Sequence, residues 1–462
     1  MSGFFKVFYK SKKSGARIGE IKTDHGVIKT PAFMPAATKG TIKSLPPQFI
    51  EDIGIQVSFV NTYHLVTHPG VDIIEKAGGI HKYTGLNIPL MSDSGGFQVF
   101  SLARSQREKL SLRGTIVTKQ SLPAGRQGQK EITSSSTSSP PRDDKKVADI
   151  RGEEQPLLVK ISEDGVKFRS TFDGKIIEFT PEKSMEYQKK IGADINIAFD
   201  ECTYYPASHE YAEKAMKRTH EWLLRCIKCK ESSIPKFFDG KQQTAKNLVS
   251  SLPSRQYLYG VIQGATFKDL RKKSAEFVVS QDTPGVAIGG VSVGESKEKM
   301  REQVKWINNY LPKDRPVHLL GVGQIDDIID LVKFGIDTFD CVEPTRLARM
   351  GQIYKAKISI FSTVSPQRPA CRQAGVPRRL SQKQKSSLSG QTDITKNIYK
   401  NNLEPVDKDC NCYICKNFTK SYLHHLFKQR EILGYTLATY HNLYVMERLF
   451  DRIREAIGNN LL

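Results

Sequence analysis

Two aspartates in this chain stand in motifs that could carry chemistry at a sugar carbon. Asp93 precedes Ser-Gly-Gly-Phe-Gln and follows an apolar run, whereas Asp340 lies in Phe-Asp-Cys-Val-Glu-Pro-Thr-Arg, which ends at Arg346. One carboxylate of such a pair can attack the anomeric carbon while the other moves protons. Taken alone, either aspartate would be interpreted as a turn former, a helix N-cap or an ion-pair partner. The arginines beside Asp340 suggest that the sugar belongs to a polyanion.

A second group of chemistry-bearing residues lies near the C-terminus. It consists of Cys410, Cys412 and Cys415, in C-x-C-x-x-C spacing, and His441. Three thiolates on a turn and one helix-borne imidazole can complete a tetrahedral zinc site, and four protein ligands indicate a structural ion. On spacing alone, His424 and His425 compete as the fourth ligand. A lone C-x-x-C, as at 226–229, is more often a chance pair, and here it lies in a helical pattern.

Eight short apolar runs, each ending in a polar or glycine motif, would position these residues. They span 32–35, 57–60, 88–91, 195–199, 257–262, 285–288, 317–320 and 338–339. Helical patterns fill several of the gaps, as at 325–333, where apolar residues recur at three- and four-residue spacing. We therefore predict an α/β fold, a (β/α)8 TIM barrel whose chemistry collects at the carboxyl ends of the strands. An open doubly wound sheet is the alternative, disfavoured because no Gly-x-Gly-x-x-Gly follows a strand.

The remaining segments suggest how the chain is divided. The N-terminus alternates like a short antiparallel sheet that plugs one end of the barrel, and 159–180 alternates around Asp173-Gly, a hairpin signal. Segments 104–158 and 362–391 have a polar, low-complexity composition, and 232–254 also resembles a loop insertion. The predicted division is a catalytic barrel over 1–361, a low-complexity insertion over 362–391, and a zinc-binding subdomain with the final barrel helix over 392–462.

The bulk composition limits the class of protein. The 462 residues carry a net charge of +21, and the chain stays basic when the two low-complexity segments are set aside, which favours an acidic partner such as nucleic acid. Eight cysteines, three of them clustered, are typical of a reduced protein with one metal site. The N-terminus lacks a signal-peptide layout and no apolar run is long enough to span a bilayer. We expect a cytoplasmic protein without membrane contact.

Together these motifs closely resemble one family, the bacterial tRNA-guanine transglycosylases (queuine tRNA-ribosyltransferase family). The matching pieces lie at 30–35, 61–65, 93–102, 199–202, 262–264, 288–295, 321–323, 339–342 and 344–346, with the cysteine motif and His441-Asn-Leu completing the set. The resemblance runs from about residue 4 to the C-terminus, outside the insertions. It implies exchange of guanine at the tRNA wobble position for a 7-deazaguanine base, as in queuosine synthesis.

The resemblance also implies roles for the two aspartates. Asp340 would attack the ribose anomeric carbon, expel guanine and form a covalent ester with tRNA. Asp93 would act as general acid/base, helping guanine to leave and deprotonating the incoming base. Two displacements retain configuration and require neither ATP nor a redox cofactor. The resemblance selects His441 as the fourth ligand of one structural Zn²⁺ per subunit.

A base pocket follows from the same resemblance. Asp200 would accept hydrogen bonds from the guanine N1 and amino edge. Gln263 and the amide of Gly290 would bind the carbonyl edge, because glycine permits close approach. Glu295 and the backbone of Val291 lie where the family senses the aminomethyl group of 7-aminomethyl-7-deazaguanine. The other residues expected at the base are Ser94, Gly95, Gly96 and Phe97, the last stacking on the ring. Cys202 and Val293 favour this free base over queuine.

The resemblance further implies two RNA-binding segments and a homodimer. The first segment is the loop Gly321, Val322, Gly323, Gln324, Ile325, Asp326 and Asp327. The second is Thr345, Arg346, Leu347, Ala348 and Arg349, whose arginines would contact phosphates or bases. Two arginines spaced three apart would otherwise indicate a solvated helix face.

Three other classes compete with this interpretation. A non-catalytic tRNA-binding subunit is disfavoured because both Asp93 and Asp340 are present. An archaeal-type relative acting elsewhere on tRNA would be expected to carry a further C-terminal RNA-binding domain. A retaining glycosidase on a barrel could use the same carboxylates, but it would need neither the arginine pair nor the zinc subdomain.

Overall fold

Eight parallel strands form the centre of the computed structural model, which describes residues 3–96, 157–170, 172–232, 255–357 and 390–462. Each strand pairs in parallel with its neighbours and overlaps one of the apolar runs. Around the sheet they follow in chain order: β4 (Ala32–Pro35), β5 (Ser58–Val60), β6 (Leu90–Ser92), β10 (Ile195–Ile197), β11 (Tyr257–Ile262), β12 (Gly285–Ile288), β13 (Val317–Leu319) and β14 (Thr338–Cys341).

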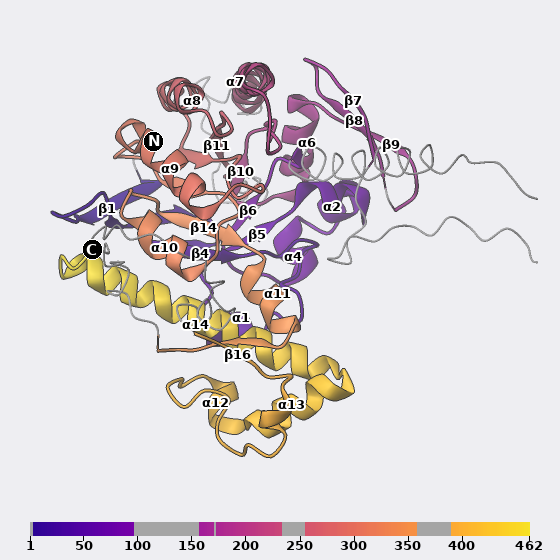
Figure 1. The fold of residues 1–462 in the computed structure, drawn as a ribbon. Helices are drawn as coiled ribbons and strands as arrows, with labels where there is room; N and C mark the ends of the chain where they lie inside the picture. The colour runs from indigo at the N-terminus through magenta and orange to yellow at the C-terminus, as the bar shows by residue number, and fades with distance from the viewer. Residues whose placement is uncertain (1–2, 97–156, 171, 233–254, 358–389) are drawn as a thin grey trace, which may run out of the picture.

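The first and second strands close this sheet into a barrel (Figure 1). The amide of Ala37, just after β4, donates to the carbonyl of Phe59 in β5 over 2.7 Å, and Ala36 forms a parallel bridge with Phe59. The predicted (β/α)8 barrel is therefore confirmed, and the open doubly wound sheet is excluded.

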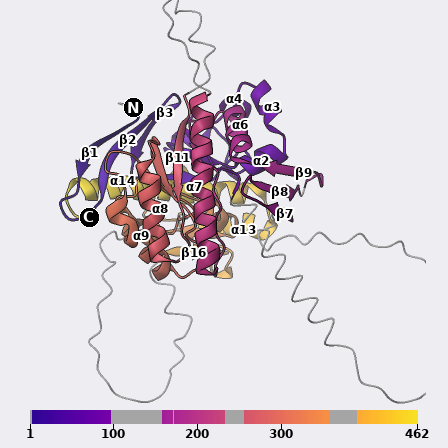
Figure 2. The same cartoon turned by 90° about the horizontal axis from the view of Figure 1, so that it is seen from above.

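Helices surround the barrel, and Figure 2 shows α7, α8 and α9 side by side along one flank. Their apolar faces explain this position: in α10, Ile328, Ile329, Leu331 and Val332 are all buried. Cys226 and Cys229 lie within α7, as their helical pattern predicted. The helices are α1 (Phe49–Ile53), α2 (Thr62–Thr67), α3 (Val71–Lys76), α4 (Ile80–Thr84), α6 (Pro181–Ile191), α7 (His209–Ser232), α8 (Lys268–Ser280), α9 (Lys297–Ile307), α10 (Ile325–Val332) and α11 (Glu343–Arg349).

Two small antiparallel sheets flank the barrel, as predicted. In the first, made of β1 (Phe5–Lys10), β2 (Arg17–Thr23) and β3 (Gly26–Thr30), Ile21 and Ile28 pack into the barrel core. Phe4, next to β1, stacks on Tyr257 at the start of β11, with ring centroids 3.7 Å apart. This sheet covers the amino end of the barrel and leaves the carboxyl end for chemistry. The second contains β7 (Leu157–Ile161), β8 (Val166–Arg169) and β9 (Ile176–Phe179), with Asp173-Gly174 between β8 and β9.

The C-terminal segment joins a small cysteine-containing unit to the barrel. It contains β15 (Gln352–Tyr354), β16 (Gln391–Asp393), α12 (Tyr413–Asn417), α13 (Lys420–Gln429) and α14 (Ile432–Gly458). The long helix α14 lies against α11 and β4 and also packs on α12 and α13 (Figure 1). One helix therefore belongs to both the barrel and the cysteine-containing unit.

The three expected insertions fall largely outside the described residues, so the division at 361 and 391 stays a prediction. Their described edges are regular: 157–158 begin β7, 232 ends α7 and 391 begins β16. Within the described ranges, no helix has the length and apolar character needed to cross a membrane.

Candidate functional site

Asp93 lies directly after β6, where backbone and side-chain groups from the end of β5 hold it. The amide of Thr62 donates to Asp93 Oδ1 over 2.7 Å, and Asn61 Nδ2 donates to Oδ2. The amide of Gly95 also donates to Oδ1, over 3.1 Å. Asn61 additionally caps α2, because its Oδ1 accepts from the amide of His64. These contacts fix the orientation of the carboxyl group.

The environment of Asp93 favours its protonated form. Burial raises its pKa to about 7, and the nearby charges of Asp340 and Asp200 act in the same direction. Hydrogen bonds from Thr62 and Gly95 partly oppose this shift because they favour the anion. A carboxyl group with a pKa near neutrality can both donate and accept a proton, as a general acid/base must.

Asp340 lies on β14 and is oriented through one of its two oxygens. The amide of Gly321 donates to Oδ1 over 2.8 Å, and His318 Nε2 lies 3.2 Å from the same atom. His318 Nδ1 lies 2.9 Å from the hydroxyl of Thr338, so one neutral tautomer can satisfy both of its contacts. Among the described residues no hydrogen bond reaches Oδ2. The two oxygens of this carboxylate therefore differ, Oδ1 accepting hydrogen bonds and Oδ2 accepting none from the described residues.

Asp200 follows β10 in a buried polar pocket. Ser94 Oγ donates to its Oδ1 over 2.9 Å, and Gln263 Nε2 donates to its Oδ2 over 2.7 Å. Burial raises the pKa of Asp200 to about 6, so it is mostly ionised at neutral pH. Gly95 and Gly96 complete the turn after Ser94, and the amide of Gly96 donates to Ser94 Oγ. Phe97, expected to stack on the base, lies outside the described residues.

Gly290 lies against Gln263, and no side chain would fit there. Its φ is +61°, and a Cβ added to it would lie 2.2 Å from Gln263 Oε1. That Oε1 is buried without a hydrogen-bond partner among the described residues. Behind these loops lies Arg271 of α8, which donates to the carbonyls of Ile262, Ala265, Gly289 and Gly290. Burial lowers the pKa of Arg271 to about 10.

Glu295 closes the turn after Gly290. Its carboxylate accepts from the amide of Ser292 over 2.6 Å and from the amide of Val293 over 3.0 Å. Val291, at the start of this turn, is buried. The structure thus places Asp200, Gln263, Gly290 and Glu295 on three neighbouring strand ends of the same barrel face.

The two expected RNA-binding segments differ in exposure. Gly321 is exposed beside Asp340, whereas Val322, Gly323 and Asp327 are buried. Gln324 and Ile325 begin α10, and Asp326 pairs with Lys297 of α9 over 2.8 Å. In α11, Thr345 and Ala348 are buried, whereas Arg346, Leu347 and Arg349 are partly accessible. Both arginines are therefore among the accessible residues of α11.

The predicted metal ligands come together in the structure. The ligand atoms of Cys410, Cys412, Cys415 and His441 lie within 4.8 Å of one another, and all four residues are buried. His441 Nδ1 lies 3.2 Å from Cys415 Sγ, and its Nε2 lies 2.8 Å from the carbonyl of Tyr354. A ring that donates from Nε2 presents an unprotonated Nδ1 to the sulfurs, as metal binding requires. This group could hold a metal ion. His424 is instead bonded to the carbonyl of Ile394.

A second cluster of possible ligands lies at the opposite end of the barrel. His25 Nδ1 is 2.7 Å from Asp194 Oδ1, and His81 Nε2 is 3.3 Å from Asp194 Oδ2. The two imidazole rings stack with centroids 3.4 Å apart and planes 9° apart. Both rings thus direct one nitrogen toward the same carboxylate. We interpret this cluster as a polar network that ties the turn between β2 and β3 to the barrel.

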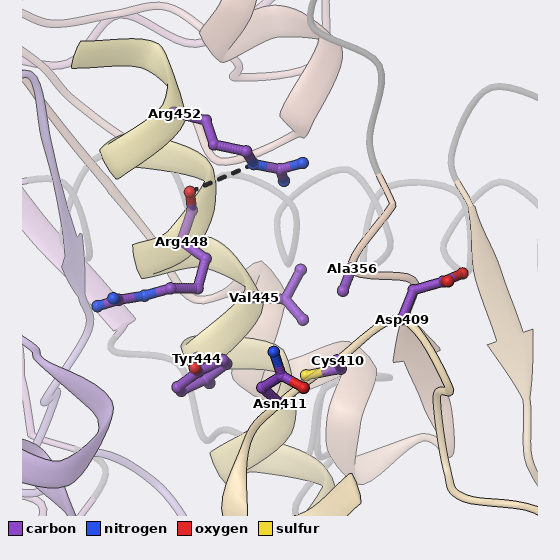
Figure 3. Close-up of a pocket in the computed structure, with 8 residues that line it drawn as sticks. All are labelled: Ala356, Asp409, Cys410, Asn411, Tyr444, Val445, Arg448 and Arg452. Carbon is purple, nitrogen blue, oxygen red and sulfur yellow. Dashed lines mark hydrogen bonds between the residues drawn. The ribbon is translucent and has the colours of Figure 1, made fainter. Parts of the chain in front are cut away.

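Two cavities lie away from the carboxylates. One of about 230 Å³ lies between α14 and the turn that carries Cys410 (Figure 3), where Arg448 and Arg452 project from the helix in different directions. The other, of about 670 Å³, lies between the loop after α2 and the β8–β9 hairpin. Apart from Cys410, none of the predicted site residues lines either cavity, so neither corresponds to the expected base pocket.

Sequence reasoning assigned no role to His318, Arg271 or Asn61. His318 lies in an apolar run that is predicted to be a strand. A polar side chain inside such a run is the one indication of a special role for this residue. Arg271 lies among lysines in the sequence, which indicates a solvated helix face. Only the folded barrel reveals that its guanidinium points inward.

Comparisons with known proteins agree on one family. The family model described as queuine tRNA-ribosyltransferase matches residues 11–125 and 143–462. A queuine tRNA-ribosyltransferase of Caldanaerobacter subterraneus is 37% identical over 458 residues, covering 99% of this chain and 94% of the relative. One of Halothermothrix orenii is 36% identical over 462 residues, covering 100% and 95%. One of Aquifex aeolicus is 36% identical over 455 residues, covering 98% and 94%.

Proposed function

The chain belongs to the queuine tRNA-ribosyltransferase family and is therefore a tRNA-guanine transglycosylase, which is a glycosyltransferase. We propose that it exchanges the guanine at the tRNA wobble position for 7-aminomethyl-7-deazaguanine. One observation carries the mechanism: two carboxyl groups with different environments lie at the same end of the barrel. Asp93 has a pKa of about 7, whereas Asp340 presents one unencumbered oxygen. This difference supports the division into proton carrier and nucleophile.

The proposed reaction is a double displacement. Asp340 Oδ2 attacks the ribose anomeric carbon while Asp93 gives its proton to the departing guanine, and the glycosidic bond becomes an ester to Asp340. The incoming base loses a proton to Asp93 and displaces Asp340 from the same carbon. Configuration is retained because the carbon is inverted twice. The donors on Oδ1, from Gly321 and His318, hold the carboxylate in line for both steps.

The base pocket supports recognition of a guanine-like edge. Ionised Asp200 offers acceptors to the N1 proton and the amino group. Gln263 Nε2 uses one hydrogen on Asp200 and keeps a second for the base carbonyl, beside the amide of Gly290. Glu295 provides a negative charge for the aminomethyl group. We propose that tRNA is gripped by Arg346 and Arg349 of α11 and by the loop 321–327.

We propose that the Cys3His group holds Zn²⁺, because three thiolates and one imidazole favour a tetrahedral zinc site. When bound, the ion would cross-link the cysteine turn to α14. Next to His441, the side chain of Asn442 donates to the carbonyls of Pro344 and Gln352. The metal-bearing helix is thereby joined to α11. A homodimer, which the resemblance implies, and a cytoplasmic location, which the composition led us to expect, belong to the same proposal.

Incorporation of labelled guanine into unmodified tRNA by the purified protein tests the exchange, with Asp340→Ala as the control. We expect incorporation and a tRNA–protein adduct on denaturing gels with the unsubstituted protein, and neither with the variant. A folded, metal-loaded protein that binds tRNA but incorporates nothing would instead support a non-catalytic tRNA-binding subunit. Competition by 7-aminomethyl-7-deazaguanine against queuine then tests which base is used.

A further inference from the structure

A buried polar chain connects the floor of the base pocket to Glu295. It starts at Arg271, whose side chain is fully buried and whose Nη2 donates to the carbonyl of Gly290 over 2.6 Å. The same Nη2 donates to Gln303 Oε1 over 2.8 Å. Gln303 belongs to α9 and is itself only 1% exposed. A buried hydrogen bond thus joins α8 to α9.

Gln303 continues the chain toward the pocket. Its Nε2 donates to Glu295 Oε1 over 3.4 Å, while the same oxygen accepts from the amide of Ser292. A glutamine side chain accepts through Oε1 and donates through Nε2, so it can bridge a guanidinium and a carboxylate. A hydrocarbon side chain would make neither bond, and an acid would repel Glu295.

The segment held by this chain is under conformational constraint. Ser292 has φ +60° and Gly290 has φ +61°, so both residues of this turn adopt the left-handed conformation. For the serine this conformation has to be maintained by surrounding contacts. Those contacts include the Glu295 carboxylate, which accepts from the amides of Ser292 and Val293. The position of Glu295 and the shape of this turn are therefore coupled.

We propose that Gln303 is a specificity-determining positioning residue: it anchors Glu295 for a base bearing a cationic 7-substituent, and Arg271 fixes Gln303 relative to Gly290. The inference rests on the proposed function, because it assigns the ammonium group of the base to Glu295. Gln303 does not touch the base. It acts by holding the Glu295 carboxylate in one position, so its loss should affect cationic bases selectively.

The test compares three bases with the full-length protein and tRNA: guanine, 7-aminomethyl-7-deazaguanine and its uncharged 7-methyl analogue. Gln303→Glu keeps an acceptor for Arg271 but removes the donor to Glu295, and Gln303→Leu removes both bonds. We expect each variant to lower kcat/KM for the aminomethyl base, relative to guanine, by about threefold to tenfold, the effect of one lost hydrogen bond. The ratio for the 7-methyl base should stay unchanged.

Glu302→Leu is the matched control, because this neighbouring residue of α9 is exposed. Its ratios should equal those of the unsubstituted protein. If Gln303→Leu fails to fold by circular dichroism, Gln303→Glu decides. An unchanged aminomethyl-to-guanine ratio, or an equal fall for the 7-methyl base, would overturn the inference while leaving exchange intact. An unsubstituted protein that exchanges no base would overturn the proposed function and this inference with it.

Discussion

Replacing Asp93 by asparagine should stabilise the protein at alkaline pH while it abolishes base exchange. Burial raises the pKa of Asp93 from 3.8 to about 7, with the charges of Asp340 and Asp200 adding to the effect. Because the folded state holds this proton more tightly than the unfolded chain, the group stabilises the fold fully below pH 3.8. That contribution is lost as the pH rises through about 7.

The magnitude follows from the two pKa values. Their difference of about 3 pKa units corresponds to roughly 4 kcal/mol at about 1.4 kcal/mol per unit. Asparagine carries no charge and so avoids this loss, but its amino group would face Asn61 Nδ2, which donates to the carboxylate. Losing that hydrogen bond costs about 1–3 kcal/mol, which offsets part of the gain in stability. We expect Asp93→Asn to be more stable by about 1–3 kcal/mol above pH 8, and less stable below pH 4.

Urea unfolding of both proteins between pH 4 and pH 9 measures this difference. The two unfolding free energies should cross as the pH rises, and their difference should level off above pH 8. Asp282→Asn, at an exposed position, serves as the control and should show no such crossing. A difference that is independent of pH would refute the raised pKa, and with it the assignment of Asp93 as the proton carrier.

Three further substitutions test other parts of the site. Asp200→Asn replaces an acceptor for the base edge by a donor, so kcat/KM for free guanine should fall by about 10²-fold or more. A guanine titration that matches the unsubstituted enzyme would contradict the proposed binding of guanine by Asp200. His318→Phe keeps a ring to pack on Phe59 but removes the contact with Asp340. We expect kcat to fall about tenfold to hundredfold with little change in KM for tRNA. A selective rise in KM would argue against a role at the nucleophile. Cys412→Ser should lose the bound metal by elemental analysis and weaken tRNA retention on filters, while Cys229→Ser, outside the metal group, should keep both.

The sequence defined the barrel well because of how parallel strands are buried. Helices cover one face of each strand and the barrel interior covers the other, so the strands appear as short apolar runs. The runs 257–262 and 285–288 match β11 and β12 to the residue. The run 338–339 was two residues short of β14, because the charged Asp340 interrupts the apolar pattern before Cys341. The strand continues through Asp340, the proposed nucleophile, where apolar patterning ends.

The buried residues that support the site were harder to predict than the proposed catalytic groups. Asp93 and Asp340 stand in distinctive motifs, whereas Arg271 sits in a basic helical stretch that resembles a solvated surface. Burying an arginine is costly unless its donors are satisfied. Here the carbonyls of Ile262 and Gly289, at the ends of β11 and β12, accept from the guanidinium, and those carbonyls are brought together only by strand pairing. No local pattern in the sequence contains that information.

Strand order explains which residues hold each carboxylate. Consecutive strands of this barrel are also neighbours in space, so the loop after one strand lies beside the loop after the next. Asp93 after β6 is held by Asn61 from the end of β5, and Asp340 on β14 is held by His318 on β13. The orienting groups therefore come from the preceding strand in both cases.

Asp200 follows the same geometry in both directions. It lies after β10 and is bonded to Ser94 after β6 and Gln263 after β11, the two neighbouring strands. In this barrel, the side chains that hydrogen-bond to these three carboxylates thus lie one strand earlier or later in the chain. Once the strands have been delimited, this rule converts barrel topology into candidate partners, and it would have selected His318 from the sequence before any contact was known.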